Sequence, residues 1–292
     1  MKLRPGDEHL IRRVLIISRI LCLVTLLLTV LTALGWLFNI PLLTHGHPAL
    51  PAMQPNAALN LALGAFAVLL TQKTQKLRKC TLVASFLAGV LLLFGLLTLS
   101  EYIFGLDLWI DRLFHTEIAT SYQPYPGRPS PQASTGFALL GAGLLVFNSR
   151  VIPIVVGQFF VLAAGANALV AMTGYIFYTS HWGFPSYVPS IGMAIHTAIG
   201  FILLTAATLC LRPKEGIMTL ITSSTSSGTI ARKILLACVT APLAIGALTR
   251  IGVQAGWWDV SAQISLFAIL MVGLILRVTW KAARQSEQEE LR

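Results

Sequence analysis

The chain has 292 residues, of which 55% are hydrophobic and only 11% are charged. Soluble domains carry about 25% charged residues, so this composition excludes an ordinary soluble protein and indicates an integral membrane protein. The formal net charge is +10, but the basic residues lie in short loops between apolar runs rather than on one soluble face. Nucleic acid is therefore not expected as a partner.

The first apolar segment covers residues 14–38 and follows a short basic stretch. A secretory signal peptide has the same order of features, but its apolar region is shorter and ends at small residues where it is cleaved. Neither condition is met here, so we expect this segment to be retained as the first membrane helix.

Eight segments approach the length of about 20 apolar residues that a membrane-spanning helix needs. In chain order they are 14–38, 55–72, 80–104, 132–149, 151–177, 190–211, 233–254 and 260–280. The second and fourth segments are short. This pattern predicts an all-α, polytopic membrane bundle of about eight transmembrane helices, arranged as repeated hairpins.

Basic residues are distributed unevenly between the two sets of loops. Eighteen Lys and Arg residues fall on the side that holds both termini, and the other side holds only Arg112, Arg128 and Arg250. Lys and Arg concentrate in cytoplasmic loops, so both termini are predicted to be cytoplasmic, with Leu106–Ala133 as the largest outer connection. All six Tyr and five of the six Trp fall at the outer ends, where aromatic rings favour the membrane–water interface.

One sequence pattern recurs three times where apolar segments begin. Residues 53–61, 129–137 and 193–201 align without gaps, and each copy places one hydrogen-bonding side chain at the same step. These side chains are Asn56, Gln132 and His196. A recurring unit predicts a recurring structure, here a membrane-spanning helical hairpin. We expect the three side chains to lie at equivalent places near the outer boundary, facing the interior of the bundle.

A second shared pattern ends the outgoing segments, where an aromatic residue, an aliphatic residue and Phe follow one another. The three copies finish at Phe38, Phe104 and Phe177. The chain is therefore expected to form four out-and-back hairpins, and the fourth, around 248–264, has diverged most from the pattern.

The last inner connection, 212–233, is longer than the others, and its Ser/Thr/Gly-rich part, 222–228, is predicted to be flexible. No Gly or Pro follows the last apolar segment, so one helix is expected to continue past Trp280 into the cytoplasm. The predicted organisation is a basic cytoplasmic tail at 1–13, a membrane domain at 14–280 and a cytoplasmic helical stub at 281–292.

Several short motifs occur in a particular order along the chain. They are Met53-x-Pro55-Asn56-x-Ala58-Leu59, then Glu101-Tyr102-Ile103-Phe104-Gly105-Leu106-Asp107 with Ile110-Asp111, then Gly127-Arg128-Pro129-Ser130-Pro131, then Met193-Ala194-Ile195-His196-Thr197-Ala198, and finally Arg212-Pro213 with Ala231-Arg232. In this order the motifs resemble the multi-spanning membrane sensor region at the N-terminus of bacterial histidine kinases, hybrid kinases and diguanylate cyclases. The resemblance covers residues 14–290. The family usually has Ser-Pro-Asn-Thr-Ala in the second copy of the repeat, whereas this chain has Gln132 at the Asn position.

The resemblance implies a sensory input module in the bacterial inner membrane, which detects an extracytoplasmic or membrane-borne small ligand and relays it through the last helix. It also implies a homodimer, contact with the lipid bilayer, and a cytoplasmic kinase or cyclase output domain in the same chain or in a separate one. In the family the output domains follow the last helix. No His-box, nucleotide-binding or cyclase motif of an output domain occurs in this sequence up to Arg292. We therefore expect either the membrane portion of a longer protein or a sensor that acts through a partner.

Glu101 is the strongest candidate for a ligand-sensing residue. It lies in an apolar run near the outer end of the third segment, where a carboxylate faces the bundle, pairs with a cation, is neutralised, or reaches headgroup water. Arg250, near the outer end of the seventh segment, is a possible counter-charge. The expected pocket is formed by Glu101, Tyr102, Tyr175, His196 and Arg250, with Asn56 and Gln132 as further candidates. Asn, Gln and His at these positions can instead cap helix starts or join neighbouring helices by hydrogen bonds.

His196 is the one histidine deep in an apolar segment, and it can titrate near neutral pH, ligate a metal or hydrogen-bond a quinone-like ligand. A quinone- or haem-linked redox protein is the second alternative and rests on His196 alone. Membrane haem normally needs two axial histidines on facing helices, so the chain argues against haem. A small transporter or permease is the first, although transporters bind at mid-membrane and these polar residues lie at one end. No cofactor is identified. A weaker alternative is an outer metal site formed by His45, His47, His115 and His181.

Catalysis within this chain is not expected, because no nucleophile, base and orienting group occur together. Any catalysis would belong to an attached or partner kinase or cyclase. Asp107 and Asp111, one helical turn apart, are expected to form a solvated face or a helix start. The four Cys residues lie in or beside apolar runs, without the spacing of a disulfide framework or zinc site, and are interpreted as small apolar residues.

Overall fold

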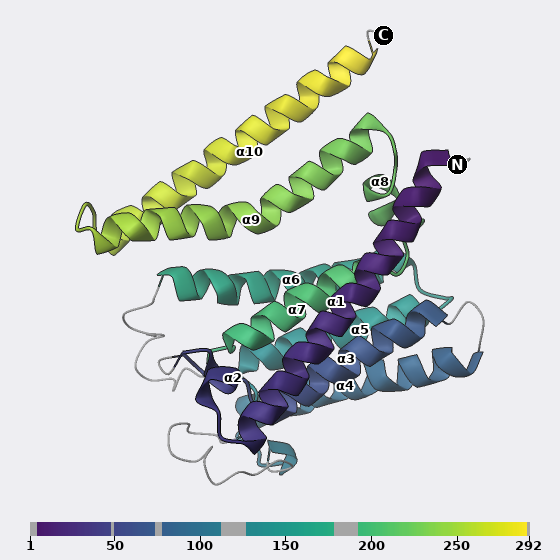
Figure 1. Ribbon diagram of the computed structural model, residues 1–292, viewed down its shortest axis with the longest axis vertical. Coiled ribbons are helices and arrows are strands. Elements are labelled where there is room, and N and C mark those ends of the chain that lie inside the picture. Colours follow the sequence, from purple (N-terminus) through teal and green to yellow (C-terminus); the bar gives the residue numbers. More distant parts are fainter. Residues whose placement is uncertain (1–4, 48–49, 74–77, 112–126, 178–191, 291–292) are drawn as a thin grey trace. The chain divides into compact units, whose positions relative to one another are not determined.

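The computed structural model describes residues 5–47, 50–73, 78–111, 127–177 and 192–290, and these residues contain helices and no β-strand (Figure 1). The helices are α1 (Pro5–Leu37), α2 (Pro41–His45), α3 (Pro55–Lys73), α4 (Arg78–Phe104), α5 (Pro131–Asn148), α6 (Ile154–Phe177), α7 (Ile195–Leu209), α8 (Met218–Ile221), α9 (Ser226–Gln254) and α10 (Val260–Glu290). The predicted all-α class is confirmed for this part of the chain.

Among the described residues, six helices are long and apolar enough to cross a membrane, namely α1, α3, α4, α6, α9 and α10. Each coincides with one of the predicted apolar segments. The remaining two segments correspond to α5, with 18 residues, and α7, a shorter apolar helix of 15 residues. Length and composition therefore support a multi-pass membrane protein with six candidate spanning helices.

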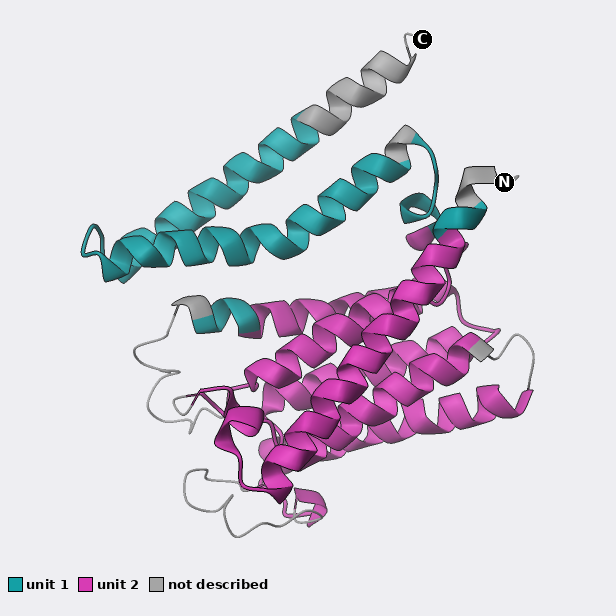
Figure 2. Ribbon diagram, in the orientation of Figure 1, with its two compact units in different colours: residues 1–10, 172–182, 219–292 teal, residues 11–171, 183–218 magenta. Residues whose placement is uncertain are grey.

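The chain divides into two compact units (Figure 2). Unit 2 comprises residues 11–171 and 183–218, and unit 1 comprises residues 1–10, 172–182 and 219–292. Unit 1 contains the α9–α10 hairpin, which is the fourth hairpin expected from the sequence. Its turn is closed by Trp258, whose Nε1 donates to the Thr249 carbonyl over 3.0 Å.

Unit 2 contains α2 to α5, α7 and most of α1 and α6, and α3, α4 and α5 run side by side in it (Figure 1). α5 lies deep in this unit, since 11 of its 18 residues are buried. Glycines allow its backbone to approach α4. A Cβ added to Gly141 would lie 2.5 Å from the Leu92 amide nitrogen, and one added to Gly95 would lie 2.6 Å from the Ala138 amide nitrogen. Small residues at helix contacts of this kind are typical of membrane proteins, where close packing drives helix association.

α1 is fastened to the rest of unit 2 by a chain of polar side chains. Arg19 Nε donates to Gln72 Oε1 over 2.8 Å, and Gln72 Nε2 donates to Ser18 Oγ over 2.7 Å. Ser18 Oγ in turn donates to the Ala207 carbonyl on α7 over 2.7 Å. These bonds connect the middle part of α1 with the last residues of α3 and α7.

The first sequence repeat is also a structural repeat. Asn56, Gln132 and His196 are each the second residue of a helix, in α3, α5 and α7 respectively. The residue before each helix accepts the same backbone bond from the fourth residue after it. These bonds are Ala58 N to Gln54 O (3.0 Å), Ser134 N to Ser130 O (2.9 Å) and Ala198 N to Ala194 O (3.0 Å). The three copies therefore begin their helices in the same register.

The second repeat also corresponds to shared tertiary contacts. Trp36, near the end of α1, donates from Nε1 to the Met53 carbonyl over 2.8 Å. Tyr102, near the end of α4, donates from its hydroxyl to the Pro129 carbonyl over 3.1 Å. Met53 and Pro129 occupy equivalent positions, each two residues before the proline that opens the next helix. The aromatic residue of the pattern thus fastens the end of one helix to the start of the next.

The last helix, α10, and the polar stretch before α9 were both addressed by the sequence. α10 is continuous from Val260 to Glu290, as predicted. Within 222–228, Thr225 caps α9 by accepting from Gly228 N over 3.2 Å, so α9 begins inside this polar stretch, and its flexibility stays a prediction. Arg232 donates to the carbonyls of Ile221 and Ser223 over 2.7 and 2.9 Å. The apolar segment predicts a start at 233, whereas α9 begins at Ser226. Hydropathy does not detect the first turns of α9, because they are polar and stabilised by a cap.

Candidate functional site

Glu101 occupies the last turn of α4 and is almost completely buried, with 1% of its surface exposed. Its Oε1 accepts a hydrogen bond from the Leu108 backbone nitrogen over 2.9 Å. The chain turns back to this position through Gly105, whose φ of +65° is a conformation that glycine adopts without steric cost. The carboxylate therefore holds the segment after α4 against the helix end.

Arg128 pairs with Glu101 and with a second carboxylate. Its Nε donates to Asp111 Oδ2 over 2.7 Å and lies 3.4 Å from Glu101 Oε2. The three side chains are 6%, 8% and 0% exposed for Arg128, Asp111 and Glu101 respectively. The guanidinium carbon also lies 5.3 Å from the centre of the Tyr102 ring, within the range of a cation–π contact. We call Glu101, Asp111 and Arg128 the charged cluster.

The charged cluster has more acidic than basic groups. Two carboxylates share one guanidinium, and the described residues supply no hydrogen-bond donor to Glu101 Oε2 or Asp111 Oδ1. Buried carboxylate oxygens without donors are costly. The arrangement therefore favours a proton, a small cation or a ligand that brings hydrogen-bond donors.

Asn56 ties this cluster to the start of α3. Its Nδ2 donates to the carbonyls of Ile110, Asp111 and Gly127 over 3.2, 3.3 and 3.1 Å. Gly127 has φ of +80°, and a Cβ there would collide with the Asp111 carbonyl. One buried amide, 2% exposed, thus holds together the two ends of the connection whose middle, 112–126, lies outside the described residues.

The other two repeat residues contact different neighbours. Gln132 Nε2 donates to the Asn167 backbone carbonyl of α6 over 3.2 Å, and Asn167 Nδ2 donates to the Gln132 backbone carbonyl over 2.8 Å. His196 is half-buried, and its ring packs on Gly46, where an added Cβ would lie 3.1 Å from the ring Cε1. Its Nδ1 is buried and has no hydrogen-bond partner in the described part of the chain. All three side chains contact protein, and the hydrogen bonds of Asn56 and Gln132 to neighbouring segments match the alternative structural role.

The structure brings together only part of the expected pocket. Glu101 and Tyr102 both contact Arg128, and Asn56 contacts the backbone beside them, all within unit 2. Tyr175 and Arg250 belong to unit 1, so their part in the pocket stays a prediction. The cation that pairs with Glu101 is Arg128, whose sequence position indicates topology and belongs to a motif of the resemblance but does not predict this ion pair.

The interpretation of Asp107 and Asp111 as a solvated face is wrong for Asp111, which is 7% exposed. Asp107 is exposed and its Oδ1 accepts from the Trp109 nitrogen over 3.2 Å. The two residues do not share a helical turn in the described structure, because the chain between them is irregular and Trp109 has φ of +62°. The spacing of one helical turn therefore does not put them on one face.

The histidine metal site stays a prediction. His45 Nδ1 lies 2.7 Å from the Thr44 hydroxyl oxygen, whereas His115 and His181 lie outside the described residues. Among the residues that the structure describes, no group of three or more His, Cys, Asp or Glu is placed to hold a metal ion.

Comparisons of the chain with protein-family models, with curated proteins and with solved structures give no match. The resemblance to membrane sensor regions therefore stays a prediction from the motifs, and the function is argued from this chain's own residues.

Proposed function

We propose that the chain is the sensory input module of a bacterial signal-transduction protein of the histidine kinase or diguanylate cyclase type. In this proposal the module lies in the inner membrane with both termini in the cytoplasm. It detects an extracytoplasmic or membrane-borne ligand, and it acts on a kinase or cyclase domain in the same chain or in a partner.

The observation that carries this proposal is the uninterrupted helix α10. Its 31 residues correspond to about 46 Å at 1.5 Å per residue, whereas the hydrocarbon core of a bilayer is about 30 Å thick. The helix is therefore long enough to cross the membrane and to extend well beyond it. A rigid element that continues from a membrane helix into the cytoplasm is what a receptor needs to move an output domain.

The proposal includes eight spanning helices, with α5 and α7 added to the six apolar ones. α5 has mostly protein neighbours, since 11 of its 18 residues are buried, and a helix that faces protein rather than lipid does not need the same hydropathy. Gly, Ala and Ser in such a helix favour close packing. An even number of spans agrees with the excess of Lys and Arg on the side of both termini.

The charged cluster and the starts of α3, α5 and α7 are the proposed signal-receiving end. Glu101 lies at the end of α4, and Asn56 at the start of α3 contacts the same connection. In the predicted orientation this end faces the outside. A one-sided group of polar residues suits a receptor, whereas a transporter binds its substrate near the middle of the membrane. A cation or a hydrogen-bond donor suits the excess of carboxylate oxygens.

The relay is tested by inserting one to four alanines after Trp280 in a chain fused to a reporter kinase domain. Each residue rotates the exit helix by about 100°, so two residues should change the output most and four should restore much of it. The same insertions placed in a flexible linker ahead of the kinase are the control. Output that ignores every insertion after Trp280 would contradict the proposed relay.

The receiving end is tested separately with Glu101→Gln and His196→Ala in the same fusion. Both variants should change the reporter output while the protein still accumulates in the membrane. Asp107→Asn is the matched control, because it changes an exposed carboxylate near Glu101 and should leave the output unaltered. Loss of folded protein in both site variants would favour a purely structural role.

A further inference from the structure

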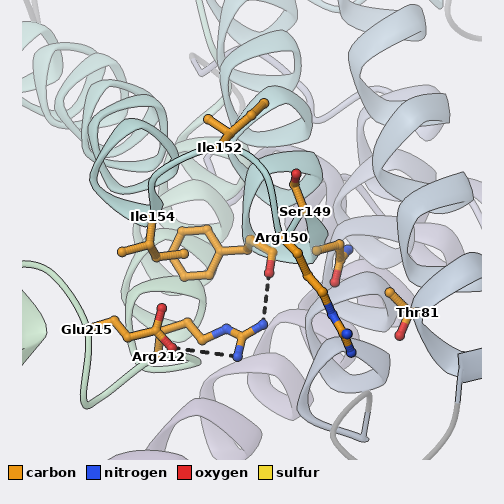
Figure 3. Close-up of a pocket in the computed structure, with 9 residues that line it drawn as sticks. Thr81, Ser149, Arg150, Ile152, Ile154, Arg212 and Glu215 are labelled. Carbon is orange, nitrogen blue, oxygen red and sulfur yellow. Dashed lines mark hydrogen bonds and ion pairs between the residues drawn. The ribbon is translucent and has the colours of Figure 1, made fainter.

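A second polar site lies at the opposite end of unit 2 from the charged cluster. It is a pocket of about 370 Å³, lined by the starts of α4 and α6, the end of α5 and the segment after α7 (Figure 3). Its polar lining consists of Thr81, Asn148, Ser149, Arg150, Arg212 and Glu215. Thr81 lies in the first turn of α4 and Glu101 in the last turn, so the two sites are separated by the length of that helix.

The two arginines of the pocket differ in their partners. Arg212 is held in place, because it donates to the Phe147 carbonyl over 3.1 Å and lies 3.8 Å from Glu215 Oε1. Figure 3 shows both of these interactions, and it shows Arg150 extending from beside Ser149 between Arg212 and Thr81. Arg150 is exposed and makes no hydrogen bond or ion pair with the residues that the structure describes. Its guanidinium is therefore available to a ligand.

Apart from the Glu215 carboxylate, which lies 3.8 Å from Arg212, other groups of the pocket also favour an anion. Thr81 in the first turn of α4 and Ile154, the first residue of α6, both line the pocket, and helix N-termini carry partial positive charge. The Phe147 carbonyl at the end of α5 is already paired with Arg212. Asn148 Nδ2 is buried without a hydrogen-bond partner in the described residues, although its Oδ1 accepts from Thr71 over 3.0 Å. A free guanidinium and two helix N-termini together match the oxygens of a phosphate group.

The surface around the pocket is apolar and exposed. Leu82 and Phe86 on α4 are 65% and 69% exposed, and Val151, Val155 and Phe159 around the start of α6 are 91%, 53% and 66% exposed. In a spanning helix these side chains face lipid acyl chains. A free phosphate ion would leave this apolar rim unused, whereas an amphiphile would contact both parts.

We propose that this pocket binds the phosphate headgroup of an anionic phospholipid, with Arg150 contacting the phosphate directly. The acyl chains lie along the exposed apolar faces of α4 and α6. Basic pockets between membrane helices at headgroup depth are suited to such lipids. This site does not depend on the sensory role proposed above, and it requires only that the bundle lies in a membrane.

The test measures the melting temperature of the purified full chain in neutral detergent during titration with phosphatidylglycerol, phosphatidylcholine or inorganic phosphate. Phosphatidylglycerol should raise the melting temperature of the wild type. Arg150→Gln should weaken the apparent affinity about tenfold, since it removes a charge-assisted hydrogen bond to the ligand. The matched control is Arg13→Gln on α1, which changes an exposed arginine outside the pocket and should keep the wild-type response.

An equal response to phosphatidylcholine, or an unchanged response in Arg150→Gln, would overturn the proposal. A shift that inorganic phosphate alone reproduces would overturn the lipid as the source of the phosphate. A shift specific to phosphatidylglycerol that is weakened in Arg150→Gln and kept in Arg13→Gln would support the proposal in full.

Discussion

Replacing Arg128 with Gln removes the cation that the described residues place against Glu101 and Asp111. At an effective dielectric constant of about 20, the attractions at 3.4 and 2.7 Å amount to about 5 and 6 kcal/mol. Most of this offsets the cost of taking the charges out of water. Leaving buried carboxylates without a partner costs about 3–5 kcal/mol in comparable cases, so we expect Arg128→Gln to lower the free energy of unfolding by this amount.

The sign of the charge predicts a rescue. With both carboxylates ionised, the three groups of the charged cluster sum to −1, and Arg128→Gln makes this sum −2. Asp111→Asn alone makes the sum zero and keeps an acceptor for Arg128, so it should cost about 1 kcal/mol or less. Combined with Arg128→Gln it should recover about 2 kcal/mol, because the two residues are in contact and their effects are not additive.

The assay is the amount of monodisperse protein after heating in detergent, measured by size-exclusion chromatography. Arg13→Gln is the control, since it removes an exposed arginine from α1. If Arg128→Gln melts together with the wild type and with this control, the cluster does not contribute to stability and the reasoning is refuted. If the double variant is less stable than Arg128→Gln alone, excess negative charge is not the cause of the loss.

Three further predictions concern packing and orientation. Asn56→Asp should lower the melting temperature more than Asn56→Ala, because a carboxylate would face the three carbonyl oxygens to which the amide donates; equal losses would argue against these bonds. Gly141→Ala should lower the free energy of unfolding by about 1–3 kcal/mol through overpacking. Gly89→Ala, with open space around it, should leave it unchanged. A tolerated Gly141→Ala would mean that α4 and α5 separate easily. In a cysteine-free background, Ser121→Cys should react with an impermeant thiol reagent on whole cells and Ser224→Cys should not; labelling of the latter would contradict the proposed orientation.

The sequence repeat predicts the first residues of the helices more accurately than hydropathy does. The ungapped repeat places Asn56, Gln132 and His196 at the second residue of α3, α5 and α7, because the same chain-entry pattern forms the same first turn. Hydropathy instead placed the seventh span at 233, whereas α9 begins at Ser226. A capped polar turn is helical for reasons of hydrogen bonding, and an apolar window has no means of detecting it.

The charged cluster could be predicted only in part. Glu101 is conspicuous because a carboxylate in an apolar run needs a partner. Its partner Arg128 lies 27 positions later in the chain, and their contact depends on how the α4–α5 connection folds. The spacing of Asp107 and Asp111 predicted a solvated face and not a buried ion pair for Asp111. This prediction failed because the expected helical turn is absent from the described segment. An ion pair between distant positions is a tertiary property that one sequence does not display.

The repeat helps to separate scaffold from site. Trp36 and Tyr102 occupy equivalent positions and make the same hydrogen bond to the next helix start, so this contact belongs to the shared architecture. The preceding position differs between the two copies. In the first copy it is Gly35, where a Cβ would meet side chains of α2. In the second copy it is Glu101, which accepts a hydrogen bond from the Leu108 nitrogen and pairs with Arg128. Packing needs only a small residue there, and a buried carboxylate is the costlier solution. The free-energy cost of burying a carboxylate occurs at Glu101 and not at the equivalent Gly35. A function specific to the second copy therefore explains Glu101 better than a requirement of the shared fold does.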